Sequence, residues 1–172
     1  PVTADAVVCA LGVIDPALRH AFGVPMPIYP VKGFSITVPI TNREAAPAHA
    51  GMDESKLIAF CPMGDKLRVT GGAEFAGYAK TSVEGDFRRL YDTMDELFPG
   101  ATDYAGATKW VCQRPMTHDS LPRYGRARYQ NLWFNIGQGH MGWAMGPGSG
   151  KIVADLVAGR QPDIDLDGLR IA

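Results

Sequence analysis

The sequence predicts a mixed fold with both α/β and α+β character. Two apolar segments, 5–12 and 131–136, have the pattern of strands buried in a parallel sheet between helices. The segment 33–39 instead alternates polar and apolar residues, as a half-buried antiparallel strand does. Apolar residues between 83 and 98 recur at helical spacing within that same middle region. We therefore expect an antiparallel α+β region between two segments of α/β type.

The first apolar strand implies neighbours that the sequence hardly provides. Parallel strands are joined by crossover connections, and few segments after residue 12 are good candidates for them. The chain also starts at Pro1, without an initiator Met or a signal-peptide pattern. We therefore expect the chain to be the tail end of a longer protein.

Local signals define the next elements. Asp15 and Pro16 suit the N-cap and first position of a short helix, which Gly23 ends. The proline-rich segment 24–30 is expected to be a crossover or hinge. It is therefore the best candidate for a domain boundary.

The middle region continues with a hairpin and a helix. Segments 57–61 and 66–70 are expected to pair as antiparallel strands. Thr81 and Glu84 form a capping box, which predicts that a helix begins there. Pro99 and the glycine after it end that helix.

The last third of the chain contains two strands and a second helix. The strands are expected at 108–113 and 131–136, and a glycine cluster follows the second one directly. Gly159 closes a helix whose first turn we expect to contain Pro147, because proline is tolerated near a helix start. The helix is predicted from a single apolar stripe formed by Ile152, Val153, Leu156 and Val157. The residues after 160 are expected to be a tail.

Composition excludes several classes of function. Hydrophobic residues make up 46% and charged residues 20%, as in a globular protein. The 17 Lys and Arg residues nearly balance the 18 Asp and Glu residues, which gives no basic patch for nucleic acid or a membrane surface. The longest apolar run, 6–14, is far shorter than the ~20 residues that span a bilayer.

The cysteines and histidines show no disulfide or metal pattern. The three cysteines, Cys9, Cys61 and Cys112, are far apart, which argues against a disulfide framework or a zinc site and favours a reducing compartment. We expect them in the core. The four histidines also share no metal-ligand spacing: His20, His49, His118 and His140. We therefore predict no metal site.

Glycine is unusually frequent: it supplies 20 of 172 residues, about 12%, whereas the typical share is ~7%. Gly137, Gly139 and Gly142 fit the pattern G-x-G-x-x-G between a strand and a helix, which is typical of dinucleotide-binding turns. That motif normally opens a βαβ unit early in its domain, and here only thirty residues follow Gly142. Two interpretations stay open: tight strand–helix packing, or a helix N-terminus directed at a bound electron-rich group.

A second cluster of specific side chains lies between 114 and 122. Arg114, held before a proline, could present its planar guanidinium to a carboxylate, or it could form a structural ion pair. His118 beside Asp119 could be an oriented base, although turn chemistry is the more frequent role of such a pair. The segment 146–151 superficially resembles a phosphate loop but lacks its glycine spacing and its Ser or Thr, so we exclude a nucleotide triphosphate site.

Taken together, these clusters resemble the C-terminal signature of FAD-dependent amine oxidoreductases of the D-amino-acid-oxidase-like superfamily. Within it the sequence is most similar to the bacterial D-amino acid dehydrogenase family (small subunit). The resemblance extends over nearly the whole chain in one order. It is carried by Trp110-x-x-x-Arg114-Pro-Met-Thr-x-Asp119-x-x-Pro122, Asn131-Leu-Trp, Gly137-x-Gly139-x-x-Gly142-Trp143, Gly148-Ser-Gly150 and Ala154-Asp-Leu156.

The resemblance implies the C-terminal portion of a two-domain flavoprotein. Residues 1–25 would then be part of the FAD-binding domain and 26–110 the substrate-binding domain with its antiparallel sheet. Residues 111–172 would return to the FAD-binding domain with strands and a helix. The FAD-binding fingerprint of this family lies at the N-terminus of proteins more than twice as long.

Site residues follow from the resemblance by position. Arg114 matches the arginine that holds the substrate carboxylate, a task that suits a bidentate guanidinium. The cofactor is FAD, which takes the α-hydrogen as hydride, so no strong general base is required. The residues that match flavin-contacting positions are Gly12, Gly137, Gly139, His140, Met141, Gly142 and Trp143.

The implied function is oxidative deamination of D-amino acids in amino-acid catabolism, with a small-molecule substrate and no nucleic acid. The implied location is the cytoplasm or the inner face of the bacterial membrane. Without the N-terminal fingerprint, we expect no activity from this chain alone. An alternative is a truncated, non-catalytic chain that folds without FAD and self-associates through an exposed strand edge. A small nucleotide-binding module, which rests on the glycine motif alone, is a third hypothesis.

Several positions depart from the family pattern around the presumed substrate pocket. His118 and Gln138 replace a usual Pro and a usual His, and Lys56 stands where an aromatic residue is expected. Cys112 and Gln113 stand where relatives usually have Gly and Leu. Because these residues lie around the presumed substrate pocket, the resemblance does not define which substrate is bound.

Overall fold

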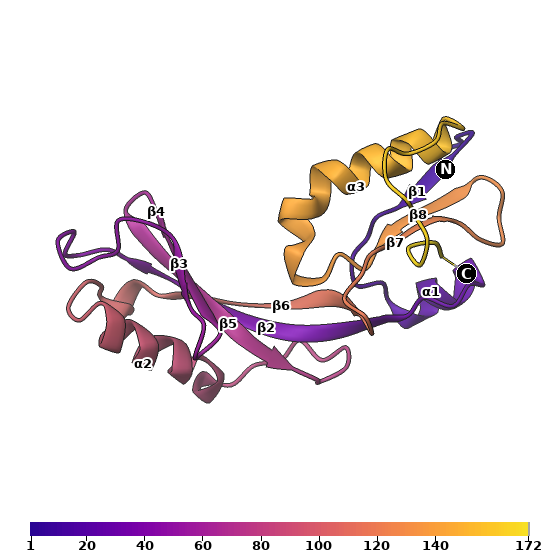
Figure 1. Cartoon of the computed structure of the whole chain (residues 1–172). Helices are drawn as coiled ribbons and strands as arrows, with labels where there is room; N and C mark the ends of the chain where they lie inside the picture. The colour runs from indigo at the N-terminus through magenta and orange to yellow at the C-terminus, as the bar shows by residue number, and fades with distance from the viewer. Residues whose placement is uncertain (172) are drawn as a thin grey trace. The chain divides into compact units, whose positions relative to one another are not determined.

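The computed structural model describes residues 1–171 and confirms the predicted mixed fold (Figure 1). The chain divides into two compact units. The split unit consists of Pro1–Pro30 and Arg114–Ala172, and the middle unit consists of Val31–Gln113. The two divisions fall within single strands, β2 (Ile28–Pro39) and β6 (Thr108–Thr117), so no loop marks either of them.

The split unit is built on a three-stranded sheet in the order β1-β8-β7. Strands β1 (Val7–Cys9) and β8 (Leu132–Ile136) are parallel, with Val8 opposite Trp133, whereas β7 (Arg123–Arg126) is antiparallel to β8. The sequence did not predict β7. Two of its four residues are arginines, so the segment lacks the alternation of polar and apolar residues that indicates a strand. Arg123 is nevertheless buried, because it forms an ion pair with Asp119.

Two α-helices accompany this sheet. The short helix α1 (Pro16–Phe22) has the predicted ends: the Asp15 carboxylate accepts a hydrogen bond from the Ala17 N–H at 2.8 Å, and Gly23 adopts a left-handed conformation. The longer helix α3 (Gly142–Val157) is followed by Gly159, also left-handed, as predicted. The buried residues of the main core are Cys9, Ile14, Val24, Met26, Ile28, Phe134, Ile136 and Ile171.

Two predictions for the split unit are wrong. Val7 and Val8 were expected to be buried on both faces of a strand, but they are 49% and 45% exposed. In the described part of the chain β1 is an edge strand, paired only with β8. Pro147 is not in the first turn of α3, because that helix already begins at Gly142.

The segment after α3 is tied back to the unit. The buried Asp155 accepts hydrogen bonds from Lys151 at 2.9 Å and from Arg160 at 2.9 Å, and Lys151 also reaches Asp163 at 2.7 Å. These cations lower the pKa of Asp155, Lys151 contributing most. The predicted tail also pairs with β7 through a parallel bridge between Tyr124 and Arg170. It is therefore an integral part of the unit.

The middle unit contains a five-stranded sheet in the order β3-β4-β5-β2-β6. Strands β3 (Gly51–Asp53), β4 (Ile58–Met63) and β5 (Lys66–Glu74) form an antiparallel meander, and β5 also pairs antiparallel with β2. The hairpin of β4 and β5 confirms the sequence prediction. Strand β2 is longer than predicted, because it begins at Ile28 inside the proline-rich segment expected to be a hinge.

One face of this sheet is covered by helix α2 (Arg88–Leu97), which follows the 3₁₀ turn η1 (Glu84–Phe87) (Figure 1). The helix occurs where its apolar spacing predicted it, but Thr81 is not its cap. The Asp86 carboxylate instead accepts a hydrogen bond from the Val83 N–H at 2.8 Å. The core between sheet and helix consists of Phe34, Ile36, Val38, Ile58, Leu67, Val69, Phe87, Leu90 and Met94.

The cysteines do not all occupy core positions. Cys9 is buried, as expected, but Cys61 is exposed and Cys112 is partly exposed. Cys61 is on the sheet face opposite α2, since its neighbours in β4 alternate toward the core. None of the helices formed by residues 1–171 combines the length and apolar character needed to cross a membrane.

Candidate functional site

A hollow of about 280 Å³ lies within the split unit. Ala10 follows the carboxyl end of β1, and Gln138 and Gly139 follow that of β8, so the hollow lies where the two parallel strands end. Ligands of open α/β sheets bind at this edge. The full lining is Ala10, Pro115, Asn135, Gln138, Gly139, Gly142, Gly146 and Ser149.

The glycine turn after β8 is imposed by backbone conformation and by packing. Gly137 and Gly139 have φ angles of +80° and +58°, which L side chains rarely adopt. A Cβ at Gly137 would lie 2.7 Å from Thr117 Cγ2, and one at Gly139 would lie 2.8 Å from Met116 Sδ. These two glycines therefore allow the chain to turn close to β6. This finding supports the packing interpretation of both residues.

The glycines inside α3, beyond its first turn, have a different environment. A Cβ built at Gly146, Gly148 or Gly150 meets no atom within 4 Å. Glycine inside a helix costs about 1 kcal/mol relative to alanine, and packing within residues 1–171 gives no reason for that cost. No side-chain hydrogen bond caps this helix among the described residues. The 3₁₀ turn η3 (Gly139–Met141) leads directly into α3, and Gly142 lines the hollow, so the positive end of the helix dipole lies at the hollow.

The predicted cofactor-binding residues lie around this turn, but only two of them line the hollow. They are Gly139 and Gly142. Gly12, with φ +68°, lies next to the lining, because a Cβ there would be 4.0 Å from Pro115 Cγ. Of the others, Gly137 is buried, whereas His140, Met141 and Trp143 are exposed, Trp143 by 98%.

The predicted substrate residue Arg114 is half-buried on β6 and does not line the hollow. The next residue, Pro115, does line it, and Met116 packs against Gly139. Side chains of a strand alternate between its faces, so Arg114 shares a face of β6 with Met116. Arg114 is thus held one residue from the hollow in a regular strand.

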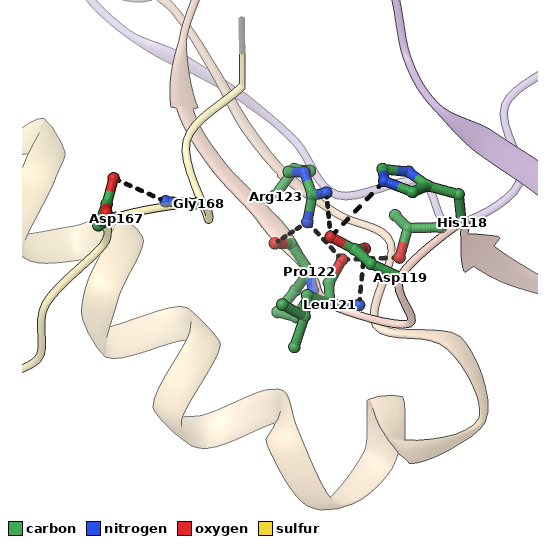
Figure 2. A network of polar contacts seen from close by, with 8 residues as sticks. His118, Asp119, Leu121, Pro122, Arg123, Asp167 and Gly168 are labelled. Atoms are coloured by element: carbon green, nitrogen blue, oxygen red, sulfur yellow. Dashed lines mark hydrogen bonds and ion pairs between the residues drawn. The ribbon is translucent and has the colours of Figure 1, made fainter.

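The cluster after β6 is a turn organised by an ion pair, as Figure 2 shows. Arg123 Nη2 donates to Asp119 Oδ2 at 2.6 Å, and Arg123 Nη1 donates to the Leu121 carbonyl at 2.9 Å. The hydrogen bond from Arg123 is the main reason why the pKa of Asp119 lies far below its usual range. His118 is 3.9 Å from that carboxylate, and its side chain is 75% exposed. The geometry therefore supports a structural role for Asp119.

Sequence reasoning missed several residues of the hollow. Gln138 donates a short side-chain hydrogen bond to Asn135, and together they form a polar wall. Ser149 is buried, and its hydroxyl lies 2.9 Å from that of Tyr124 on β7. Ala10 could have been found from the rule that residues just beyond parallel strands form ligand sites. The hydroxyl pair depends on tertiary contacts that no sequence pattern shows.

Cys9 is close to the hollow in sequence but is not a reactive thiol. It is 4% exposed, and burial raises the pKa of its thiol. A raised pKa disfavours the nucleophilic thiolate. The chemistry of this region therefore consists of backbone N–H groups, an amide pair and a guanidinium close by. Such groups bind and orient; none of them is a strong base or nucleophile.

The structure thus combines an α/β unit, with a hollow where its two parallel strands end, and an antiparallel sheet unit. Comparison with known proteins agrees with it. The DAO family, described as FAD dependent oxidoreductase, matches residues 2–156. The chain therefore belongs to the DAO family of FAD-dependent oxidoreductases, and the resemblance seen in its motifs is confirmed.

Curated relatives are named D-amino acid dehydrogenases. The chain is 45% identical over 169 residues to D-amino acid dehydrogenase 2 of Mesorhizobium japonicum, covering 98% of this chain and 41% of that protein. It is 46% identical over 169 residues to D-amino acid dehydrogenase of Granulibacter bethesdensis, covering 98% of this chain and 40% of that protein. The chain thus spans about two-fifths of the length of the curated relatives that it matches.

Solved structures show the same fold. Glycine oxidase from Geobacillus kaustophilus aligns with a TM-score of 0.83 at 24% identity, over 98% of this chain and 45% of that chain. Iminodiacetate oxidase from Chelativorans sp. aligns with a TM-score of 0.81 at 21% identity, over 99% of this chain and 47% of that chain.

Proposed function

We propose that this chain forms the C-terminal portion of an FAD-dependent oxidoreductase that deaminates D-amino acids. The observation that carries the proposal is the hollow where β1 and β8 end, bordered by the glycine turn and the uncapped start of α3. The names of the curated relatives support the substrate class. In this proposal the split unit belongs to the FAD-binding domain and the middle unit to the substrate-binding domain.

Arg114 is proposed to hold the substrate carboxylate. Its guanidinium can form two parallel hydrogen bonds to a carboxylate, which fix the orientation of the α-carbon as well as its position. The regular strand β6 supports this role, because a residue held by strand hydrogen bonds is placed more rigidly than one in a loop. Pro115 and Met116 further hold the strand against Gly12 and Gly139.

The backbone from Gly139 to Gly142 is proposed to contact the pyrimidine edge of the flavin. N–H groups and the positive end of the α3 dipole stabilise negative charge that develops at such an edge, without reorganising during the reaction. When bound, FAD supplies the redox chemistry by accepting a hydride from the α-carbon of the amino acid.

The hollow fits part of that cofactor. The open space beside Gly146 would be lost if the residue carried a side chain, and Gly139 and Gly142 also line the hollow. The volume of about 280 Å³ is below the ~300–1,000 Å³ of most small-molecule sites, so this unit suits one ring system and not a whole dinucleotide. We therefore expect weak retention of FAD by this chain alone.

A chimera tests the proposal. The aligned 169 residues of D-amino acid dehydrogenase 2 of Mesorhizobium japonicum are replaced by those of this chain. We expect a yellow protein whose flavin band bleaches on anaerobic addition of D-alanine. Arg114→Gln in the chimera should lower kcat/KM by about 30-fold or more, because a carboxylate loses a charged partner worth at least ~2 kcal/mol.

The control is Arg128→Gln, which removes an arginine from the same unit, where its side chain lies beside Gly23 and over Tyr129. It should leave kcat/KM within about twofold of the parent chimera, a difference of less than ~0.5 kcal/mol. Flavin retention without bleaching by D-alanine would contradict the substrate assignment. Loss of flavin from a folded chimera would contradict the cofactor assignment.

A second candidate is a non-catalytic chain that self-associates without FAD. The exposed edge of β1, with Val7 and Val8 about half exposed, favours it, since an unpaired strand edge is a template for another strand. Analytical ultracentrifugation of the chain with and without FAD separates the two. A colourless dimer that Val8→Lys converts into a monomer would support the second candidate.

A further inference from the structure

The sheet of the middle unit has one face that α2 does not cover. Side chains of β2 and β5 alternate, so that Ile36 and Val69 enter the core while Ser35, Arg68 and Thr70 lie on the opposite face. We call this opposite face the open face. No helix of the middle unit packs on it among the described residues. Trp110 also lies on this face, because the next residue of β6, Val111, packs against the core.

Arg68 is held on the open face by two contacts. Its Nη2 donates to Ser35 Oγ at 3.2 Å, and its guanidinium carbon lies 5.0 Å from the centroid of the Trp110 ring. Ser35 is 2% exposed, whereas Trp110 is 53% exposed. A buried hydroxyl on one side and an aromatic ring on the other restrict the guanidinium plane. The planar cation is therefore oriented before any ligand arrives.

The donors of this cluster are largely unused. In the part of the chain that the structure describes, Arg68 donates to Ser35 alone and forms no ion pair, and the Trp110 indole N–H has no acceptor. Two other partly buried cations of the unit have carboxylate partners. Lys32 pairs with Glu74 at 2.9 Å, and Lys56 pairs with Glu96 at 2.5 Å. The exposed Arg43 donates to the Gly64 carbonyl at 2.6 Å. An arginine without a carboxylate is thus exceptional among the partly buried cations of this unit.

The charge of the open face is positive. Arg68 and Lys66 are two positions apart on β5, and the register of β2 to β5 brings no Asp or Glu onto this face. The nearest cross-strand neighbours of Arg68 are Thr37 and Cys61, neither of which is a carboxylate. An anion there would meet a fixed cation without competition from a protein carboxylate.

We propose that Arg68, Ser35 and Trp110 form a binding site for a small organic carboxylate on the open face. The guanidinium would donate two parallel hydrogen bonds to the carboxylate, while the indole ring contacts the apolar part of the ligand. The site consists of residues from the middle unit alone. It is separate from the role proposed for Arg114 and does not depend on FAD.

Titration of the isotope-labelled chain by NMR tests this site. The probes are phenylacetate and the neutral phenylacetamide, which has nearly the same shape. Phenylacetate should shift the Arg68 Nε–H and Trp110 indole signals saturably, with a Kd on the order of 1 mM for a ligand of this size. Phenylacetamide should bind at least about tenfold more weakly, because a neutral amide cannot form the bidentate ion pair. Equal shifts with both probes would overturn the proposal.

Variants assign the binding to the residues. Arg68→Gln should weaken phenylacetate at least about tenfold, and Arg68→Lys should weaken it less, since lysine keeps the charge but loses the fork. Arg43→Gln, the matched control on the same unit, should bind like the parent. Methyl signals of Ile36 and Val69 report whether each variant is folded. Shifts that persist in a folded Arg68→Gln chain but vanish in Arg114→Gln would overturn this site and support the proposed substrate residue.

Discussion

The two units differ in how completely they bury their own strands. In the middle unit, Ile36, Ile58 and Leu67 are 0% exposed beneath helix α2. In the split unit, Val7 and Val8 of the parallel strand β1 are about half exposed, and α3 holds glycines, such as Gly148, where an added Cβ would meet no atom within 4 Å. The middle unit thus buries its apolar strand residues with its own sheet and helix. The split unit leaves apolar strand surface exposed, and this is where the proposed cofactor or a second strand would bind.

The largest expected effect concerns the core of the middle unit. Ile58→Ala leaves a cavity under a fully buried position and should lower the free energy of unfolding of that unit by about 2–5 kcal/mol. The check is ¹⁹F NMR of fluorotryptophan-labelled protein during urea unfolding, with Trp110 reporting on the middle unit and Trp133 on the split unit. An equal shift of both unfolding curves would show that the units unfold as one body.

The next effect concerns the glycine turn. Gly137→Ala adds a Cβ 2.7 Å from Thr117 Cγ2 at a φ of +80°, so the split unit should lose about 2–3 kcal/mol. The same fluorine probes apply, with the Trp133 signal now unfolding first. Unchanged stability would mean that the turn relaxes freely, and the packing interpretation of Gly137 would then be wrong.

A smaller effect of opposite sign is expected inside α3. Gly148→Ala meets no atom within 4 Å and should stabilise the split unit by about 0.5–1 kcal/mol through helix propensity. Gly146→Ala should stabilise the unit similarly, but in the chimera it should also reduce flavin retention, because Gly146 lines the hollow. Equal flavin retention by both variants would argue against a ring bound beside Gly146.

The smallest expected effect concerns how the free energy of unfolding falls at acid pH. In the folded chain, hydrogen bonding by Arg123 keeps the pKa of Asp119 below the pKa that this residue has in the unfolded chain. As the pH falls, Asp119 is therefore protonated in the unfolded state before it is protonated in the folded state. This contribution is complete above about pH 4 and is lost as pH falls through the lower, folded pKa. Asp119→Asn should therefore flatten the decline in stability below pH 4 in chemical denaturation curves. If the decline keeps its steepness in the variant, carboxylates other than Asp119 cause the loss of stability.

Much of the fold could be predicted because local signals agreed with the tertiary structure. Asp15, Pro16 and Gly23 fix the ends of α1 by backbone chemistry alone, and the alternation in β2 fixes which side enters the core. Strand β7 was missed because Arg123 is buried only through its pairing with Asp119, four residues away. The cap of η1 was misplaced because Asp86, rather than the Thr81 box, satisfies the Val83 N–H.

The candidate site was predictable in part. The glycine spacing located the turn after β8, but it did not distinguish glycines required by φ, such as Gly137, from the unhindered Gly146. The Ser149–Tyr124 hydroxyl pair joins α3 to β7, and that contact exists only once both elements have packed. Sequence patterns locate backbone turns well, whereas side chains that meet across elements require the folded structure.

The ties between Asp155, Lys151 and Arg160 have a consequence for proteolysis. Trypsin cleaves after Arg160, and the side chain of this residue is 62% exposed, so accessibility alone would make it an early cleavage site. A protease must, however, draw several residues into an extended conformation, which here requires Arg160 to leave Asp155 and the following segment to leave its bridge with Tyr124. We therefore expect the segment after α3 to be protected by its own contacts, so that a nick there reports the local opening of that segment.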